Sequence, residues 1–294
     1  MIVNLVEFVK NNFFDSLKID EKYCVVSDFD FNIENANFYK IESLEPVGQI
    51  VALAEKYKKV FIVLDRLNYD NIYRLYKYDL KNVCILNLNS GYTGIWKKSL
   101  SPDLDDIYIK ENVEVLEAMD KENLLFFIYE FLENPRFTHI RIPNKEVEEK
   151  LWDGALDYRE IINFNQFWIT GFNGTILSYG SLLQETLNVV GLFQSEGINF
   201  DMFWIWNYKQ DFTNDLISSL ENQDKVFIIW DFSDTYFKDF IYSKFYDAGI
   251  VKEDIYFITP ENTDKQVFDE MLSDSVNMQP VQMYERIRSK IGTG

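Results

Sequence analysis

The stretch that decides the fold is residues 168–208, WITGFNGTILSYGSLLQETLNVVGLFQSEGINFDMFWIWNY. Its pattern predicts a strand at Thr175–Tyr179, a helix capped by Ser181 and ended by Gly197, and a second strand at 200–206. Apolar residues recur through the helix at three- and four-residue spacing, at Leu183, Leu187, Val190 and Phe193. The second strand is almost wholly apolar, which is typical of a strand buried on both faces of a sheet. Two such strands joined by one helix form a right-handed βαβ unit in a parallel sheet.

The same alternation of apolar strands and amphipathic helices extends through the rest of the chain. In the N-terminal half it predicts a helix at residues 3–17, followed by strands and helices up to a last strand, HIRIP, at 139–143. A charged EVEEK run then indicates a linker. We therefore predict an α/β fold of two consecutive three-layer domains with parallel sheets, at residues 1–144 and 165–294, joined by a linker at 145–164.

Composition excludes several classes of protein. Of the 294 residues, 47% are hydrophobic, which excludes a disordered chain. The formal net charge of -19 argues against nucleic acid and against an anionic membrane surface, since both require basic patches. We find no apolar run long enough to span a bilayer and expect no signal peptide, because residues 1–17 carry charges throughout. Cys24 and Cys84 lie inside apolar runs, so we expect buried free thiols and a cytoplasmic protein.

Common catalytic motifs are missing. His139 is the only histidine, which leaves no histidine-based metal site or catalytic triad. Neither a P-loop, a GxGxxG fingerprint, a CxxC pair, an HExxH motif nor a GxSxG elbow occurs. The acidic residues Asp28, Asp30, Asn32 and Glu34 lack the glycine and the terminal glutamate spacing of an EF-hand, so we interpret them as a solvated turn.

The order of several segments resembles the C-terminal half of the transketolase family, which comprises a pyrimidine-binding domain and a C-terminal domain. The opening stretch, with its SYGS turn and its EGI, is similar to the start of the family's C-terminal domain, where TGS and EGI occupy these places. Upstream, YDNI at 69–72 is similar to the family's YDQI, and HIRIP is similar to YIRIPR. The resemblance extends to deoxyxylulose-phosphate synthases and to the beta subunits of pyruvate-dehydrogenase-type decarboxylases.

The resemblance implies site residues. Aligning ESLEP with the family's GIAEQ places Glu45 on the glutamate that hydrogen-bonds the aminopyrimidine of thiamine diphosphate, which makes Glu45 the expected catalytic and cofactor-binding residue. Gly91 and Thr93 fall in a loop that binds the cofactor in the family, and Arg141 and His139 become expected substrate-binding residues. From the residues alone, alternatives stay open: Glu45 can simply complement a helix dipole, and His139 and Arg141 can fill ordinary strand positions.

Three family features are absent from this chain. The aromatic that stacks on the aminopyrimidine is missing after the strand at 60–64, and the histidine of the family's GxTHxxxED loop is missing after Gly91. The GDG…N motif, which in the family holds the diphosphate and magnesium on a preceding domain, does not occur either.

The resemblance therefore implies the C-terminal subunit of a split transketolase-like enzyme that transfers a two-carbon ketol unit between sugar phosphates. We expect a homodimer, or a heterotetramer with an N-terminal transketolase-type subunit that holds Mg²⁺ and the diphosphate. The alternative is a degenerate, non-catalytic paralogue that keeps the fold for assembly or regulation.

Overall fold

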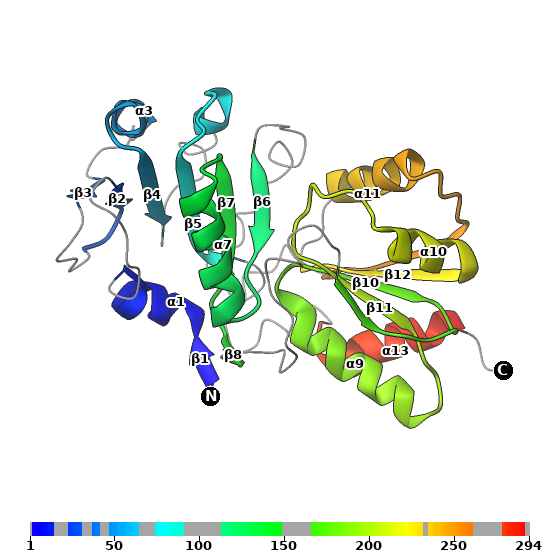
Figure 1. Cartoon of the computed structure of the whole chain (residues 1–294). Coiled ribbons are helices and arrows are strands. Elements are labelled where there is room, and N and C mark those ends of the chain that lie inside the picture. Colours follow the sequence, from blue (N-terminus) through cyan, green and yellow to red (C-terminus); the bar gives the residue numbers. More distant parts are fainter. Residues whose placement is uncertain are drawn as a thin grey trace. The chain divides into compact units, whose positions relative to one another are not determined.

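The computed structural model describes residues 2–14, 23–30, 37–41, 47–64, 74–90, 113–148, 166–231, 235–260 and 278–291. The chain divides into two compact units, Met1–Tyr158 and Arg159–Gly294, which we treat separately (Figure 1). The division falls within the predicted linker range 145–164. Most of that range lies outside the described residues, so the exact linker bounds stay a prediction.

The first unit is built on a six-stranded sheet in which every neighbouring pair is parallel. Its strand order is β3-β2-β4-β5-β7-β6. The strands are β2 (Tyr23–Ser27), β3 (Asn37–Lys40), β4 (Lys59–Leu64), β5 (Val83–Ser90), β6 (Glu114–Glu117) and β7 (Thr138–Pro143). The central strands are largely apolar and mostly buried, as expected for strands covered on both faces.

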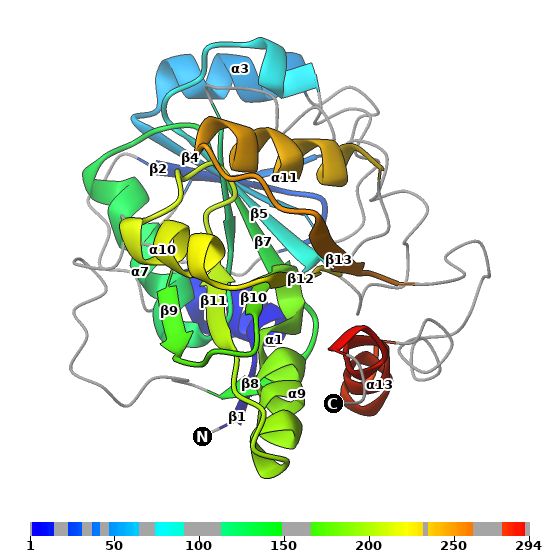
Figure 2. The ribbon, with the colours of Figure 1, turned by 90° about the vertical axis from the view of Figure 1, so that its right-hand side faces the viewer.

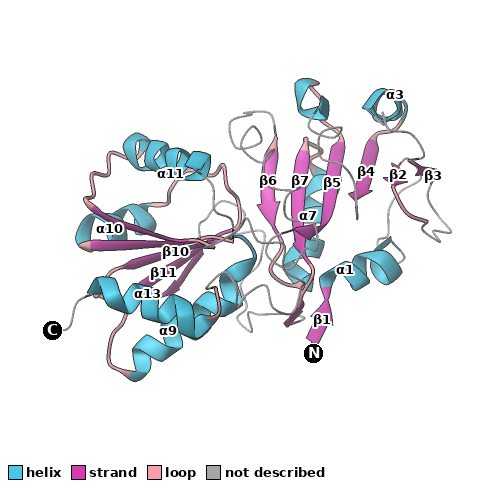
Figure 3. Cartoon of the chain, turned by 180° about the vertical axis from the view of Figure 1, so that it is seen from behind, coloured by secondary structure: helices cyan, strands magenta, loops and turns pink. Residues whose placement is uncertain are grey.

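Helices cover both faces of this sheet. On one face, the ring of Phe61 in β4 packs edge-on against two other rings. Its centre lies 5.2 Å from the ring centre of Phe131 in α7 (Lys121–Glu133) and 5.8 Å from that of Phe14 in the N-terminal segment. The opposite face carries α3 (Val47–Lys56) and the 3₁₀ helix η2 (Arg74–Lys77), whose Tyr76 stacks on His139. Three layers therefore enclose the first core, as predicted (Figure 3).

Helix α7 shows why the sequence specified its helices well. The side chain of Asp120 accepts the backbone N–H of Asn123 at 2.7 Å, which caps the helix. Its apolar stripe is buried: Leu124, Phe127, Ile128 and Phe131. The helix ends at Glu133, two residues before Pro135. The start, the buried face and the end of this helix are therefore all encoded by residues close together in the sequence.

The N-terminal segment departs from the predicted single helix at 3–17. Residues Ile2–Asn4 form strand β1, which pairs antiparallel with β8 (Glu146–Glu148). The Asn4 side chain then accepts the N–H of Glu7 at 3.1 Å and starts the short helix α1 (Leu5–Phe8), which continues as the π-helix η1 (Val9–Phe13). The prediction failed at its start because strand β8, which is distant in the sequence, supplies hydrogen bonds that local helix propensity cannot anticipate.

The second unit contains a five-stranded sheet of order β13-β12-β10-β11-β9. Four strands are parallel, and β9 joins the edge antiparallel to β11. The strands are β9 (Gln166–Ile169), β10 (Thr175–Tyr179), β11 (Asp201–Ile205), β12 (Lys225–Ile229) and β13 (Asp254–Ile258). The predicted parallel sheet is confirmed, with an antiparallel edge strand added.

Helices again lie on both sides of the second sheet (Figure 1). Helices α9 (Leu183–Ser195) and α13 (Pro280–Ile291) pack together on one side, with the rings of Phe193 and Tyr284 4.5 Å apart. Helices α10 (Asn214–Asn222) and α11 (Thr235–Asp247) lie on the other side (Figure 2).

The βαβ unit of the opening stretch is present as β10, α9 and β11. Gly197 ends the helix with a φ of 78° and donates its N–H to Gln194 O at 3.0 Å, as predicted. The predicted cap at Ser181 is wrong. A 3₁₀ turn, η4 (Gly180–Leu182), comes between the strand and α9, so Leu182 takes the N-cap position without a side-chain cap hydrogen bond.

Candidate functional site

The topology of the first sheet indicates where a ligand would bind. From β2 the chain passes to β3 on one side and then to β4 on the other, so the strand order reverses between β2 and β4. In open parallel sheets, ligands bind outside the carboxyl ends of the strands at such a switch point. The acidic turn that follows β2 lies at this place.

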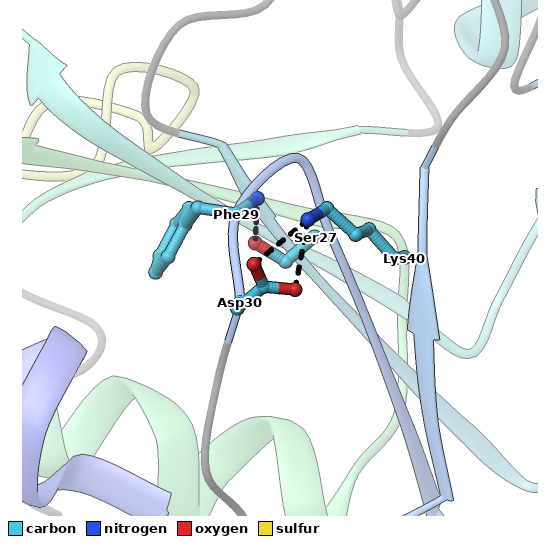
Figure 4. Close-up of polar contacts among 4 residues, drawn as sticks. All are labelled: Ser27, Phe29, Asp30 and Lys40. Carbon is cyan, nitrogen blue, oxygen red and sulfur yellow. Dashed lines mark hydrogen bonds and ion pairs between the residues drawn. The ribbon is translucent and has the colours of Figure 1, made fainter.

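Four residues fix the turn after β2 (Figure 4). The hydroxyl of Ser27 is buried and accepts the N–H of Phe29 at 3.1 Å. The ammonium of Lys40, at the end of β3, donates to both carboxylate oxygens of Asp30 at 2.8 Å. Ile41 donates its N–H to Ser27 O at 2.7 Å, so the chain ends that leave β2 and β3 are held together.

The turn is solvated, as the sequence indicated. The side chains of Asp30 and Lys40 are 80% and 40% exposed, and an exposed ion pair of this kind stabilises a protein by about 0–1 kcal/mol. Phe29 is covered by Lys10 of η1, whose ammonium lies 5.5 Å from the ring centre. Of the acidic series considered above, Asn32 and Glu34 lie outside the described residues.

The residues expected to contact a cofactor lie outside the described ranges. Glu45 falls in 42–46, and Gly91 and Thr93 fall in 91–112. Their roles stay predictions. The described residues that precede them lie at the carboxyl ends of two strands of the first sheet. Strand β3 ends at Lys40, shortly before Glu45, and strand β5 ends at Ser90, directly before Gly91.

Arg141 belongs to a buried row of polar side chains across three strands. Asn87 in β5, Arg141 in β7 and Glu117 in β6 are register neighbours, and all three are buried. The guanidinium donates to a Glu117 carboxylate oxygen at 2.7 Å, with the two side chains 1% and 0% exposed. At this position Arg141 neutralises a buried carboxylate. Its role as a substrate ligand stays a prediction.

His139 lies two residues earlier on the same face of β7 and is fully buried. Its Nδ1 shares a hydrogen bond of 2.7 Å with the Tyr76 hydroxyl, and the two rings are stacked. Burial first, and the nearby charge of Arg141 second, lower the pKa of His139 to about 3. The imidazole is therefore neutral near pH 7 and offers a substrate no positive charge.

Sequence reasoning missed the partners of these two residues. Glu117 was not singled out, although a carboxylate that directly follows the apolar residues Val115 and Leu116 in a predicted strand is a recognisable signal of a buried ion pair. Tyr76 carries no comparable signal, because its place in a short 3₁₀ helix depends on tertiary packing.

The described residues contain no ready metal site. Within the ranges that the structure describes, no group of three or more His, Cys, Asp or Glu side chains is placed to hold a metal ion. No helix in them is long and apolar enough to cross a membrane.

Both cysteines are buried and free, as predicted. Burial raises the pKa of Cys24 to about 12, and burial raises the pKa of Cys84 well above its usual value. The thiols therefore stay protonated, and neither is a candidate nucleophile.

No family model and no curated protein matches the sequence. Several solved structures do match. A split-gene transketolase, described as an inactive beta4 tetramer, superposes with a TM-score of 0.70 at 13% identity, over 98% of this chain and 95% of that chain. Transketolase from Pichia stipitis in complex with sedoheptulose-7-phosphate superposes with a TM-score of 0.72 at 9% identity, over 99% of this chain and 46% of that chain. A mutant of that enzyme in complex with xylulose-5-phosphate gives the same values.

These similarities confirm the predicted fold. The chain has a transketolase-like α/β fold, spans less than half of the Pichia stipitis enzyme and spans nearly all of the split-gene chain.

The buried imidazole makes acid stability dependent on His139. Below about pH 6.5 the unfolded chain binds a proton at this residue that the native chain does not bind until about pH 3. Stability should therefore fall as pH falls through this window, by up to about 1.4 kcal/mol per pH unit. Because the chain has one histidine, the imidazole NMR signal belongs to His139 without further assignment.

In that experiment we expect the imidazole signal of the folded protein not to titrate between pH 7 and pH 5. The His139→Gln variant should have a shallower dependence of unfolding free energy on pH than the wild type. A folded-state titration near pH 6.5 would contradict the buried, neutral imidazole.

Removing one partner of the Arg141–Glu117 ion pair should lower the free energy of unfolding strongly. Arg141→Met leaves the Glu117 carboxylate buried without this guanidinium, which we expect to cost about 3–5 kcal/mol in urea unfolding. The double variant Arg141→Met, Glu117→Leu should recover much of that loss because no buried charge remains. Additive losses in the double-mutant cycle would show that the two side chains do not depend on each other.

Proposed function

We propose that this chain is the C-terminal subunit of a split, transketolase-type enzyme that requires a separate subunit for activity. The observation that supports the proposal is the superposition on a split-gene transketolase chain, over 98% of this chain and 95% of that chain. The same residues superpose on 46% of the undivided Pichia stipitis enzyme. In this proposal the two units correspond to the pyrimidine-binding and C-terminal domains, and no GDG…N motif occurs in the sequence.

The proposed reaction is transfer of a two-carbon ketol unit between sugar phosphates, with thiamine diphosphate as the cofactor. When bound, the cofactor supplies the carbanion chemistry. In this chain Glu45 would accept a hydrogen bond at the pyrimidine end, and Gly91 and Thr93 would line the cofactor. Arg141 and His139 remain the proposed substrate-binding residues. All of these roles rest on the family resemblance.

The partner subunit would supply the magnesium and diphosphate site, because no GDG…N motif occurs in this sequence. The formal net charge of -19 supports this division, because an acidic chain repels a doubly charged diphosphate unless a metal or a cationic pocket offsets the repulsion. We propose a heterotetramer of two such pairs, and a homodimer of this chain when the partner is absent. The reduced thiols support a cytoplasmic location.

A degenerate paralogue is the second candidate. Two observations favour it: the imidazole of His139 is neutral and buried, and the guanidinium of Arg141 is occupied by Glu117. Both side chains then serve the core of the first unit, and the chain keeps the fold for assembly or regulation without a cofactor.

Titration calorimetry with thiamine diphosphate and Mg²⁺ separates the two candidates. We expect no measurable binding to the isolated chain, because it lacks the diphosphate site and the stacking aromatic, the latter a contact of the order of 1 kcal/mol. Submillimolar affinity should appear when a GDG-bearing partner chain is added. Tight binding by the isolated chain would refute the division between subunits. Absence of binding by the assembled pair would favour the degenerate paralogue.

The same calorimetric titration, applied to variants of this chain, tests the role of Glu45. Glu45→Gln should weaken cofactor binding by the pair, because a hydrogen bond to a charged acceptor is worth about 1.5–3 kcal/mol. Glu55→Gln is the matched control, since Glu55 is an exposed glutamate on the neighbouring helix α3 and should leave the affinity unchanged. Equal affinities for both variants would remove Glu45 from the proposed site.

A further inference from the structure

The second sheet has a switch point of its own. From β10 the chain passes through α9 to β11 on one side, and it returns to β12 on the other side of β10. By the rule that applies to the first sheet, a ligand would bind outside the carboxyl ends of β10 and β12. Gly180 directly follows β10, and Asp231 comes two residues after β12. These two residues therefore lie at the second switch point.

The carboxylate of Asp231 fills this place. The side chain is fully buried, and it lies directly against the backbone of Gly180. A Cβ added to Gly180 would lie 2.4 Å from Asp231 Oδ1, 2.6 Å from its Cγ and 2.8 Å from its Oδ2. Cβ atoms in proteins essentially never approach other atoms this closely, so a residue with a Cβ at position 180 would displace the carboxylate.

The backbone conformation at position 180 is a second reason why glycine is required there. Its φ is +73°, in the left-handed region that residues with a Cβ adopt at a cost. The turn it makes leads at once into η4 and α9, so that the first N–H groups of this helical segment lie at the same edge of the sheet. Helix α11 also begins at this edge, four residues after Asp231. Helix starts favour a negative charge.

Buried aromatic side chains flank Gly180 and Asp231, since Tyr179 precedes the glycine and Trp230 precedes the aspartate. The ring of Phe237 stacks on Trp230 at 3.5 Å between centres and meets Tyr179 edge-on at 5.1 Å. Tyr208 lies 5.8 Å from Tyr179, and all four rings are buried. Burial raises the pKa of Tyr179, so its hydroxyl stays neutral and adds no negative charge beside Asp231. A carboxylate in such a setting is stable only where polar groups of the chain compensate it.

We propose that Asp231 is the built-in occupant of the second switch point and takes the place that an anionic ligand would hold there. The second domain then binds no phosphate or carboxylate ligand at the carboxyl ends of β10 and β12. This inference is independent of the proposed enzyme and holds equally for a non-catalytic paralogue.

Glycine variants test the contact between Gly180 and Asp231. Gly180→Ala should lower the melting temperature of the full chain more than Gly197→Ala does. Gly197 is the matched control because its φ is +78° and a Cβ there would meet nothing within 4 Å. In an Asp231→Ala background, the effect of Gly180→Ala should shrink to that of Gly197→Ala. Equal effects of the two glycine substitutions in the wild-type background would overturn the proposal.

Small anions test the occupancy itself. At matched ionic strength, formate should raise the melting temperature of Asp231→Ala relative to chloride, because it replaces the lost carboxylate. The wild type should respond to neither formate nor phosphate beyond chloride. Asp231→Asn fills the same space without a charge, so it should melt lower than the wild type and show no response to formate.

A wild-type chain that formate or phosphate stabilises as much as Asp231→Ala would show that the switch point takes a ligand and would overturn the proposal. Absence of any formate response in folded Asp231→Ala would also count against it. If Asp231→Ala does not fold, the comparison of Gly180→Ala with Gly197→Ala in the wild-type background still decides.

Discussion

Parallel pairing of strands that are buried on both faces constrains everything else in this chain. Such strands need helices on both sides of the sheet, and they place all their carboxyl ends at one edge. Polar side chains that enter these strands must then be compensated inside the protein. In the first unit the Arg141 guanidinium meets Glu117 at 2.7 Å. In the second unit Asp231, two residues after β12, is fully buried against Gly180.

The two sheets use their switch points differently. In the first unit, the turn after β2 is open to solvent, with Asp30 80% exposed and paired with Lys40 at the surface. In the second unit the corresponding place is filled by a fully buried aspartate. This contrast supports a division in which ligand chemistry belongs to the first domain together with a partner subunit, and in which the second domain contributes folding and assembly.

Much of the fold was predictable, because its signals are local. Helix α7 carries its cap at Asp120, its apolar stripe and its terminal proline within sixteen residues, and the β10–α9–β11 unit is equally complete in sequence. The predictions failed where the local structure depends on contacts with other parts of the chain. Strand β1 depends on β8, strand β9 pairs in the antiparallel direction, and η4 shifts the helix cap from Ser181 to Leu182.

The site was less predictable, for a physical reason. A residue's charge state depends on what surrounds it, and neither the Tyr76 hydroxyl beside His139 nor the Glu117 carboxylate beside Arg141 follows from spacing along the chain. Glu45, Gly91 and Thr93 stay predictions that rest on resemblance. The most direct test of the central claim is ketol transfer from a ketose phosphate to an aldose phosphate by this chain mixed with a GDG-bearing partner chain, thiamine diphosphate and Mg²⁺. The account predicts turnover by the mixture and none by either chain alone. An assembled pair that binds the cofactor but transfers no ketol unit, or turnover by one chain alone, would contradict it.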